Sequence, residues 1–247
     1  MASSGNHQTL GIIPARWGST RFPGKPLHLI AGKPLVQHVW ERAQQCKLLD
    51  QITIATDDER ILNAAHSFGA HAVLTSENHP TGTDRIAEAV SSYPDARYVI
   101  NIQGDEPLIE PSLIDELATA LHKNPAISMA TAANPIEDTE AMNDPNVVKC
   151  VLTQNGEALY FSRSPIPYQR ADSPNLSLFR HKGIYAYRRD FLEKFVIWPP
   201  SPLELAESLE QLRALENNAR IKVLITSDDS IGVDTLEQAQ QIEKLLQ

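Results

Sequence analysis

Hydrophobic positions in the first half of the chain recur in two alternating rhythms. Short apolar runs at residues 10–13, 52–56, 71–75 and 98–103 are typical of buried parallel strands. Apolar side chains at helical spacing predict helices at 34–46, 84–91 and 111–124, and another that Asp57 or Asp58 caps and that ends at Gly69. Strands that alternate with helices in this way indicate right-handed βαβ crossovers and a doubly wound sheet. Ligands of such sheets lie at the carboxyl ends of the strands.

The pattern loosens after residue 124. Apolar runs at 129–133 and 147–152 flank an acidic segment at 137–144, which indicates a smaller subregion at about 125–200. A capping-box pattern with proline at the first helical position starts a helix at 201 that ends near 217–218. A strand at 221–226 and a helix at 235–246 follow. We therefore expect a flexible tail at residues 1–9 and a single α/β domain at 10–247.

Composition narrows the class of protein. Hydrophobic residues make up 42% and charged residues 21% of the 247 residues, which is ordinary for a soluble globular domain. No apolar run approaches the roughly 18 residues of a membrane span, and the start of the chain lacks a signal-peptide pattern, so we expect a cytoplasmic protein without membrane contacts. Cys46 and Cys150 are the two cysteines and form no zinc or disulfide pattern. A net charge of −9 argues against nucleic-acid binding.

Positive charge is nevertheless concentrated at one place. No acidic residue occurs between residues 1 and 40, and the loop after the first strand presents Arg16, Arg21 and Lys25 beside the hydroxyls of Ser19 and Thr20. Fixed cations and accessible backbone N–H groups favour phosphate oxygens. The loop therefore suits a polyanion, although a solvated basic turn has the same composition.

Motif absences limit the chemistry of this loop. Five residues separate Gly18 from Gly24, and Pro26 stands where a P-loop hydroxyl would hold magnesium, which argues against a P-loop NTPase. No GxGxxG follows a strand, and GxSxG and HExxH are absent. Cations and isolated carboxylates without a nucleophile signature are what transfer between phosphates requires.

Two aspartates at strand ends are candidate metal ligands. Asp105 follows the strand at 98–103 after Gly104, and Asp234 lies after the strand at 221–226. Magnesium is typically held by one or two carboxylates plus substrate phosphates, so this pair would suffice. The alternatives are a turn aspartate before Pro107 and a cap for the helix that begins at Thr235.

A second basic zone spans residues 158–189, where Asp172 is the one acid. Within it, His181 and Tyr185 lie on one face of a β-type run, where they could meet a ligand or pack as an aromatic stripe. Further on, Glu210 could be a solvated partner of Arg213 through an i,i+3 pair.

Several separated motifs occur in a fixed order from about residue 10 to 246: IPARWGSTRFPGKPL, ATDD, HPTGTDRIAEAV, NIQGDEPLI, ALYFSRSPIP, RHKGIYAYRRDFL, SPLELAESLEQLRALE and GVDT. Together they closely resemble the family of 3-deoxy-manno-octulosonate (Kdo) cytidylyltransferases, or CMP-Kdo synthetases. The resemblance implies a Rossmann-like, three-layer nucleotidyltransferase fold with a mostly parallel central sheet and a smaller inserted dimerisation and sugar-binding subregion. It also implies a magnesium-dependent homodimer that transfers CMP from CTP to Kdo, releases pyrophosphate and supplies lipopolysaccharide synthesis.

The resemblance also implies roles for individual residues. Arg16, Lys25 and Asp105 would be catalytic, and Asp105 and Asp234 would bind the metal. The nucleotide would contact Pro14, Ala15, Arg16, Ser19, Thr20, Lys25, Thr81, Gly82, Thr83, Arg85 and Gln103. The sugar acid would contact Arg21, Gln103, Arg163, His181, Tyr185, Glu210 and Gln211. Threonine at position 81 replaces a frequent serine but keeps the hydroxyl.

Two other functions fit parts of the pattern. A CMP-sialic acid synthetase shares the IPAR start, but STRFPGKP and QGDEP favour Kdo. A non-catalytic nucleotide-binding module could keep the loop, but it would not need Asp105 and Asp234. An amino-sugar analogue of Kdo also remains open as the acceptor.

Overall fold

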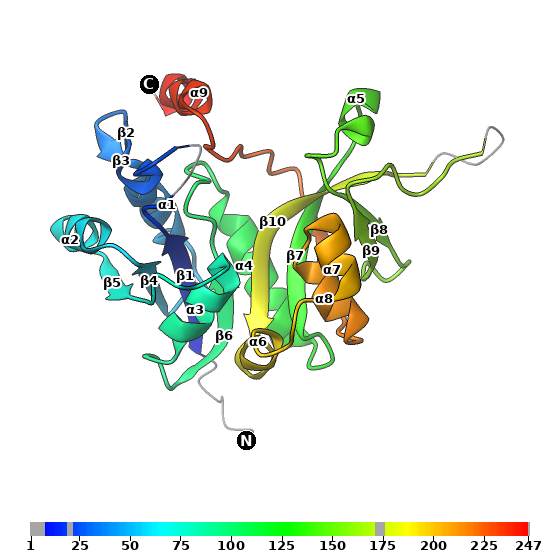
Figure 1. Ribbon diagram of the computed structural model, residues 1–247, viewed down its shortest axis with the longest axis horizontal. Coiled ribbons are helices and arrows are strands. Elements are labelled where there is room, and N and C mark those ends of the chain that lie inside the picture. Colours follow the sequence, from blue (N-terminus) through cyan, green and yellow to red (C-terminus); the bar gives the residue numbers. More distant parts are fainter. Residues whose placement is uncertain (1–7, 19–21, 171–175, 247) are drawn as a thin grey trace. The chain divides into compact units, whose positions relative to one another are not determined.

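The computed structural model describes residues 8–18, 22–170 and 176–246 (Figure 1). The chain forms two compact units. Unit 1 comprises Met1–Ala118 with Ser230–Gln247, and unit 2 comprises Thr119–Asp229. The subregion expected at about 125–200 falls within unit 2.

Unit 1 is built on a parallel sheet with the strand order β6-β1-β4-β5. These strands are β1 (Gln8–Ala15), β4 (Gln51–Thr56), β5 (His71–Leu74) and β6 (Ala96–Asn101). Their apolar runs form the core, where Ile12, Ile54 and Ile100 are fully buried. The first strand begins two residues earlier than predicted, because Thr9 is fully buried and its N–H donates to Asp50 at 2.7 Å.

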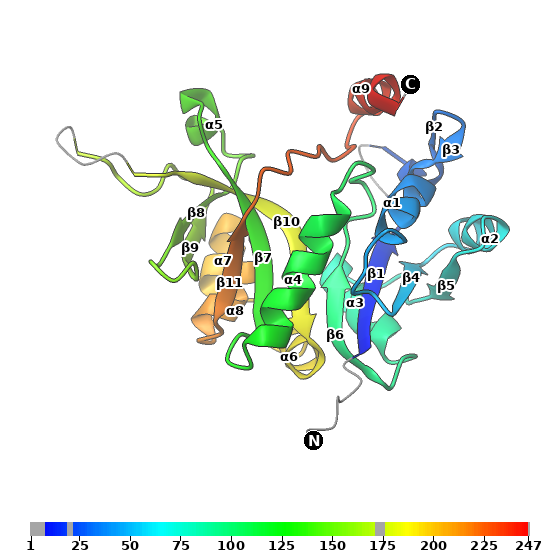
Figure 2. The same ribbon diagram turned by 180° about the vertical axis from the view of Figure 1, so that it is seen from behind.

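Helices cover both faces of this sheet. Figures 1 and 2 show α3 on one face of β1 and α1 on the other, which gives the three layers that the sequence predicts. The helices of unit 1 are α1 (Leu35–Ala43), α2 (Glu59–Ser67), α3 (Gly82–Val90), the start of α4 (Pro111–Lys123) and α9 (Leu236–Leu246), with the short helix η1 (Lys25–Leu27) and the hairpin β2 (Leu29–Ile30) and β3 (Lys33–Pro34). The Asp58 side chain caps α2 by accepting the Arg60 N–H, as predicted. The α/β fold class is thus confirmed.

Unit 2 contains a mixed sheet. β11 (Ile221–Ile225) pairs parallel with β7 (Met129–Pro135), and β7 pairs antiparallel with β10 (Phe179–Arg188). β8 (Lys149–Leu152) pairs antiparallel with β10 and with β9 (Ala158–Ser162). Two short helices that the sequence analysis did not predict are α5 (Thr139–Asn143), in the acidic segment, and α6 (Arg189–Phe195).

The single helix predicted from residue 201 is wrong. The structure has two helices there, α7 (Pro202–Glu207) and α8 (Gln211–Glu216). The break lies at Ser208, whose φ of 51° is in the left-handed region and ends α7. The predicted capping box at Ser201 and Glu204 is present. Arg213 of α8 donates to both Glu204 oxygens at 2.7 and 2.6 Å, and this buried ion pair joins the two helices.

None of the helices within the described ranges is both long and apolar enough to cross a membrane.

Candidate nucleotide site

Unit 1 contains a cavity of about 460 Å³ where the ends of β1 and β6 meet the start of α3. Its lining includes most residues to which the sequence assigns the nucleotide and the metal: Pro14, Ala15, Arg16, Lys25, Thr81, Gly82, Arg85, Gln103, Asp105 and Asp234. The position agrees with the rule that ligands of parallel sheets lie at the carboxyl ends of the strands. Four lining residues have no role in the sequence analysis: Pro26, His79, Pro80 and Gly104.

Gly104 allows two chain segments to approach closely at this cavity. A Cβ atom at position 104 would lie 2.5 Å from the Pro14 carbonyl oxygen, which is closer than any real side chain allows. Any other residue would push the end of β6 away from the end of β1. The glycine therefore brings Gln103 and Asp105 to the same cavity as Pro14.

Gly24 turns the basic loop back on its own start. Its φ of 70° is left-handed, its N–H donates to the Trp17 carbonyl at 3.1 Å, and a Cβ there would lie 2.9 Å from the Trp17 ring. Lys25 follows at the start of η1 and reaches the cavity. Ser19, Thr20 and Arg21 lie outside the described residues, so their phosphate and sugar contacts stay predictions.

Lys25 joins the two predicted metal ligands. Its Nζ donates to Asp105 Oδ2 at 2.7 Å and to Asp234 Oδ1 at 3.1 Å. The Val233 N–H donates to the Asp105 carbonyl at 2.8 Å, which fixes the two segments side by side. Capping of α9 does not depend on the Asp234 carboxylate, because Thr235 and Gln238 form a reciprocal capping box.

The donor set fits a magnesium ion. Both carboxylates converge on one cationic centre, and their side chains are 31% and 43% exposed, so an ion can reach them. Oxygen ligands are what Mg²⁺ prefers. The described residues contain no group of three or more metal-ligating side chains, so substrate oxygens and water would have to complete the coordination.

The start of α3 forms another wall of the cavity. The Thr81 hydroxyl accepts the Asp84 N–H at 3.2 Å and donates to the Asp84 carboxylate at 2.7 Å. Gly82 in the first turn lines the cavity, where the partial positive charge of the helix N-terminus favours an anion. The structure does not bring Thr83 to this lining, since Thr83 is 3% exposed and packs inside unit 1.

Two further side chains on this wall are held by neighbours. Arg85 is 3% exposed and donates to Thr75 at 2.6 Å and to Asp57 at 2.8 Å. His79, which the sequence analysis did not assign to the site, is paired with Glu88 of α3. The signal that could have indicated His79 is its place directly before the PTGTDR stretch.

In unit 2 the structure brings together His181, Tyr185 and Glu210, which are three of the residues predicted to meet the sugar acid. His181 Nε2 lies 2.9 Å from the Thr131 hydroxyl, and its ring centroid lies 5.4 Å from that of Tyr185. Burial lowers the pKa of His181 to about 3, so the imidazole is neutral near pH 7. Burial, and secondarily the nearby charge of Glu210, raise the pKa of Tyr185.

The other predicted sugar contacts have structural partners. The Arg163 guanidinium donates to the backbone carbonyls of Glu207 at 2.7 Å and Pro145 at 2.9 Å. Glu210 lies 3.5 Å from Arg213, as the i,i+3 alternative predicts, and Gln211 is 4% exposed. A role for these residues toward the sugar acid stays a prediction.

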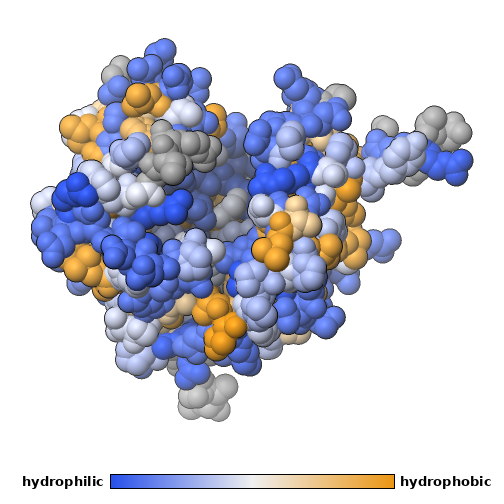
Figure 3. Space-filling model, viewed as in Figure 1, coloured by the Kyte–Doolittle hydropathy of each residue, from blue (hydrophilic) through white to orange (hydrophobic). Residues whose placement is uncertain are grey.

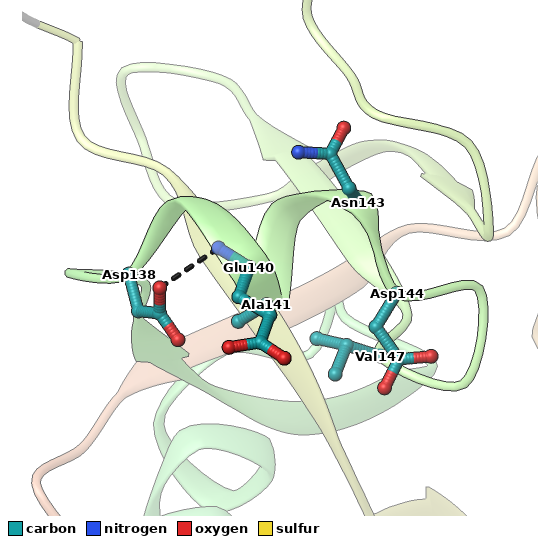
Figure 4. A pocket seen from close by; sticks show the side chains of 6 residues that line it. All are labelled: Asp138, Glu140, Ala141, Asn143, Asp144 and Val147. Carbon is teal, nitrogen blue, oxygen red and sulfur yellow. Dashed lines mark hydrogen bonds between the residues drawn. The ribbon is translucent and has the colours of Figure 1, made fainter.

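A second cavity, of about 650 Å³, lies in unit 2 at α5 (Figure 4). Its lining residues are Asp138, Glu140, Ala141, Asn143, Asp144 and Val147. Three carboxylates without a cation among the described lining residues would repel a triphosphate. The cavity of unit 1, with Arg16, Lys25 and Arg85, is therefore the candidate nucleotide site.

Comparison with known proteins gives a consistent result. The cytidylyltransferase family model matches residues 10–221. The 3-deoxy-manno-octulosonate cytidylyltransferase of Geobacter sulfurreducens is 51% identical over 245 residues, covering 95% of this chain and 98% of that protein. The protein of the same name from Thermodesulfovibrio yellowstonii is 51% identical over 250 residues, covering 96% of this chain and 98% of that protein.

Solved structures agree with the fold. A CMP:2-keto-3-deoxy-manno-octonic acid synthetase complexed with CTP superposes with a TM-score of 0.93 at 42% identity, covering 97% of this chain and 98% of that chain. A 4-diphosphocytidyl-2C-methyl-D-erythritol synthase from Anaerococcus prevotii shares the fold with a TM-score of 0.65 at 15% identity, covering 97% of this chain and 96% of that chain. The chain therefore belongs to the cytidylyltransferase family and, within it, to the 3-deoxy-manno-octulosonate cytidylyltransferases.

Proposed function

We propose that this enzyme transfers CMP from CTP to the anomeric hydroxyl of Kdo and releases pyrophosphate, making CMP-Kdo for lipopolysaccharide synthesis. The observation that carries the proposal is the cluster of Lys25, Asp105 and Asp234 in the lining of the unit 1 cavity. Relatives of about half-identical sequence have this activity in their names, and a similar solved structure contains CTP.

The chain's own residues supply positioning and charge. The anomeric oxygen of the acceptor attacks the α-phosphorus of CTP in line with the leaving pyrophosphate, so one P–O bond forms, one breaks and the hydroxyl proton is lost. Arg16 and Lys25 offset the negative charge that shifts onto the departing pyrophosphate. The start of α3 at Gly82 adds backbone N–H groups to the anion-binding wall. No covalent enzyme intermediate is needed.

Asp105 and Asp234 would hold magnesium in this proposal. When bound, Mg²⁺ would neutralise phosphate charge and lower the pKa of the attacking hydroxyl. Lys25 would then exchange its contacts with the two carboxylates for contacts with phosphate oxygens, which are equally good partners for an ammonium group.

The sugar acid is assigned to the group of His181, Tyr185 and Glu210 in unit 2. A neutral imidazole, a phenol and a carboxylate form hydrogen bonds with sugar hydroxyls rather than an ion pair with the acid. The acceptor carboxylate therefore needs a cation, and Arg163 is the candidate within unit 2. Kdo is favoured over sialic acid by the relatives' names, and an amino-sugar analogue of Kdo stays an alternative acceptor.

We further propose a cytoplasmic homodimer that joins through unit 2. Leu159 of β9 and Leu205 of α7 are 58% and 67% exposed, and Figure 3 shows hydrophobic side chains gathered over these elements. Exposed apolar side chains that gather in one patch mark protein interfaces, whereas single exposed apolar residues are common on any surface. Analytical ultracentrifugation of the wild type and of Leu205→Glu tests the assignment, since the variant should sediment as a monomer.

The function is tested by measuring pyrophosphate release with CTP, Mg²⁺ and Kdo, and by identifying CMP-Kdo by mass spectrometry. Sialic acid and the amino-sugar analogue of Kdo replace Kdo in parallel reactions. Kdo should give the largest kcat/KM. Binding of CTP without pyrophosphate release from any acceptor would instead support a non-catalytic nucleotide-binding module.

A further inference from the structure

We propose that Asp57 is a positioning residue that fixes the start of the basic loop and couples this loop to Arg85 in the unit 1 cavity. The inference rests on the proposed function, because it assigns Asp57 to the binding of CTP phosphates. Two aspartates, one at each end of β4, accept backbone N–H groups from β1 and from the loop that follows β1. Asp50, directly before β4, accepts the Thr9 N–H at 2.7 Å, and Asp57, directly after β4, accepts the Trp17 N–H at 3.2 Å.

The two aspartates form hydrogen bonds at opposite ends of the β1–β4 pair, but their surroundings differ. Asp50 acts where β1 begins, at the end of the sheet away from the cavity. Asp57 acts where β1 has ended and the basic loop starts, next to the cavity-lining residue Arg16. A function specific to nucleotide binding should therefore depend on Asp57 and not on Asp50.

The second oxygen of Asp57 carries the link to Arg85. Arg85 Nη2 donates to Asp57 Oδ2 at 2.8 Å, and the two side chains are 4% and 14% exposed. Arg85 Nη1 donates to the Thr75 hydroxyl at 2.6 Å. A charge-assisted hydrogen bond in so dry a place is strong, so Asp57 cannot move without also disturbing Arg85.

Trp17 links the position of Asp57 to Arg16 and Lys25, two of the three cations of the basic loop. The Arg60 guanidinium lies 3.4 Å from the centroid of the Trp17 ring, and the Trp17 carbonyl accepts the Gly24 N–H at 3.1 Å. Trp17 therefore fixes Arg16, its neighbour in sequence, and Lys25, the neighbour of Gly24. Loss of the Asp57 contact should loosen both cations where they face the phosphates.

The test compares four variants of the full-length enzyme: Asp57→Ala, Asp57→Asn, Asp50→Ala and Asp50→Asn. Thermal unfolding measures the stability that is lost when a hydrogen bond between the β4 end and β1 or its loop is removed. Calorimetric titration measures the affinity for CTP, which depends on the position of the basic loop. We expect both alanine variants to lower the Tm, and Asp57→Ala alone to weaken CTP binding by about tenfold or more, because only this variant removes the acceptor of both the Trp17 N–H and Arg85. Asp57→Asn should recover part of this affinity, because its amide oxygen still accepts the Trp17 N–H.

Each other outcome overturns the inference. If the CTP affinity of Asp57→Ala stays within about twofold of the wild type, or if Asp50→Ala loses as much CTP affinity, Asp57 contributes only to stability. If Asp57→Ala does not fold, the asparagine pair decides in the same way, since Asp57→Asn must bind CTP more weakly than Asp50→Asn. Failure of the wild type itself to bind CTP would contradict the proposed function, which separates the two results.

Discussion

Lys25 Nζ donates to Asp105 Oδ2 at 2.7 Å, although 80 residues separate the two along the chain. The same ammonium lies 3.1 Å from Asp234, so one cation balances two carboxylates that would otherwise repel each other. The cluster keeps both carboxylates directed toward one point before substrate arrives. Binding energy is then not spent on assembling them.

Asp105→Asn should lose nearly all turnover with little loss of stability. The carboxylate is partly exposed and contributes to a charged site rather than to the core. A lost metal ligand removes several kcal/mol of transition-state stabilisation, so we expect kcat to fall by about a hundredfold or more. Pyrophosphate release measures kcat and thermal unfolding measures Tm, with the exposed Asp95→Asn as a matched control. Wild-type activity in Asp105→Asn would contradict its assignment as a metal ligand.

Lys25→Met should separate the two partners of this lysine. At saturating CTP we expect kcat to fall by about a hundredfold, because one fixed cation facing the developing charge is lost. Without nucleotide, Asp105 and Asp234 should bind Mn²⁺ more tightly than in the wild type, because the lysine charge no longer competes with the metal ion, as measured by electron paramagnetic resonance. Lys33→Met, which alters a surface pair with Glu41, is the control. An unchanged kcat would reduce Lys25 to a surface charge.

The parts of the fold that the sequence predicts are those set by local chemistry. The apolar strand runs, the Asp58 cap and the capping box at Ser201 depend on neighbours within a few residues, and the structure contains all of them. The break at Ser208 is not signalled, because serine rarely adopts a left-handed φ and no glycine marks the position. The sequence also does not predict the short helix α5, since five residues are too few for a periodic pattern.

The candidate site divides in the same way. The motif resemblance names most residues that line the unit 1 cavity, but it does not predict which residues they bond to. The approach of Gly104 to Pro14 and the hold of Asp57 on Arg85 join segments distant in sequence, so no local pattern contains them. His79 was missed because pairing with Glu88 appears only once α3 is folded.

Glu204→Gln should destabilise the corner between α7 and α8 in a pH-dependent way. Burial alone would raise the pKa of Glu204, but hydrogen bonds from Arg213 and from the Ser201 N–H outweigh it and hold that pKa below its ordinary 4.5. The stability from this group is thus present above about pH 4.5 and is lost as pH falls through the folded-state pKa. At pH 7 we expect a loss of about 3 kcal/mol, because one partner of a buried ion pair is removed.

Urea unfolding at pH 7, 5 and 3 measures this difference between wild type and Glu204→Gln, which should shrink at the lowest pH. Glu193→Gln is the control, since it alters the exposed i,i+4 pair with Arg189 and should cost less than about 0.5 kcal/mol. A difference that stays constant down to pH 3 would show that the charge of Glu204 contributes nothing.

His181 should remain neutral throughout the range in which an ordinary histidine titrates. Burial lowers its folded-state pKa from 6.5 to about 3, so the unfolded chain binds a proton that the folded chain does not. Neutral His181 therefore reduces the free energy of unfolding progressively as pH falls from 6.5 toward 3. His181→Asn should therefore lose less stability than the wild type on acidification. NMR of the His181 ring that shows titration near pH 6.5 would contradict the assignment.

Gly104→Ala should damage the site through backbone geometry alone. A methyl group at position 104 would lie 2.5 Å from the Pro14 carbonyl, so the end of β6 has to shift and carry Asp105 with it. Overpacking of this kind costs about 1–3 kcal/mol, and a displacement of about 1 Å at a catalytic group costs about a hundredfold in rate. Gly183→Ala is the matched control, because no atom lies within 4 Å of a Cβ there. We expect Gly104→Ala to lower both Tm and kcat while Gly183→Ala keeps both, and equal behaviour of the two variants would show that the close approach of β6 to β1 does not position Asp105.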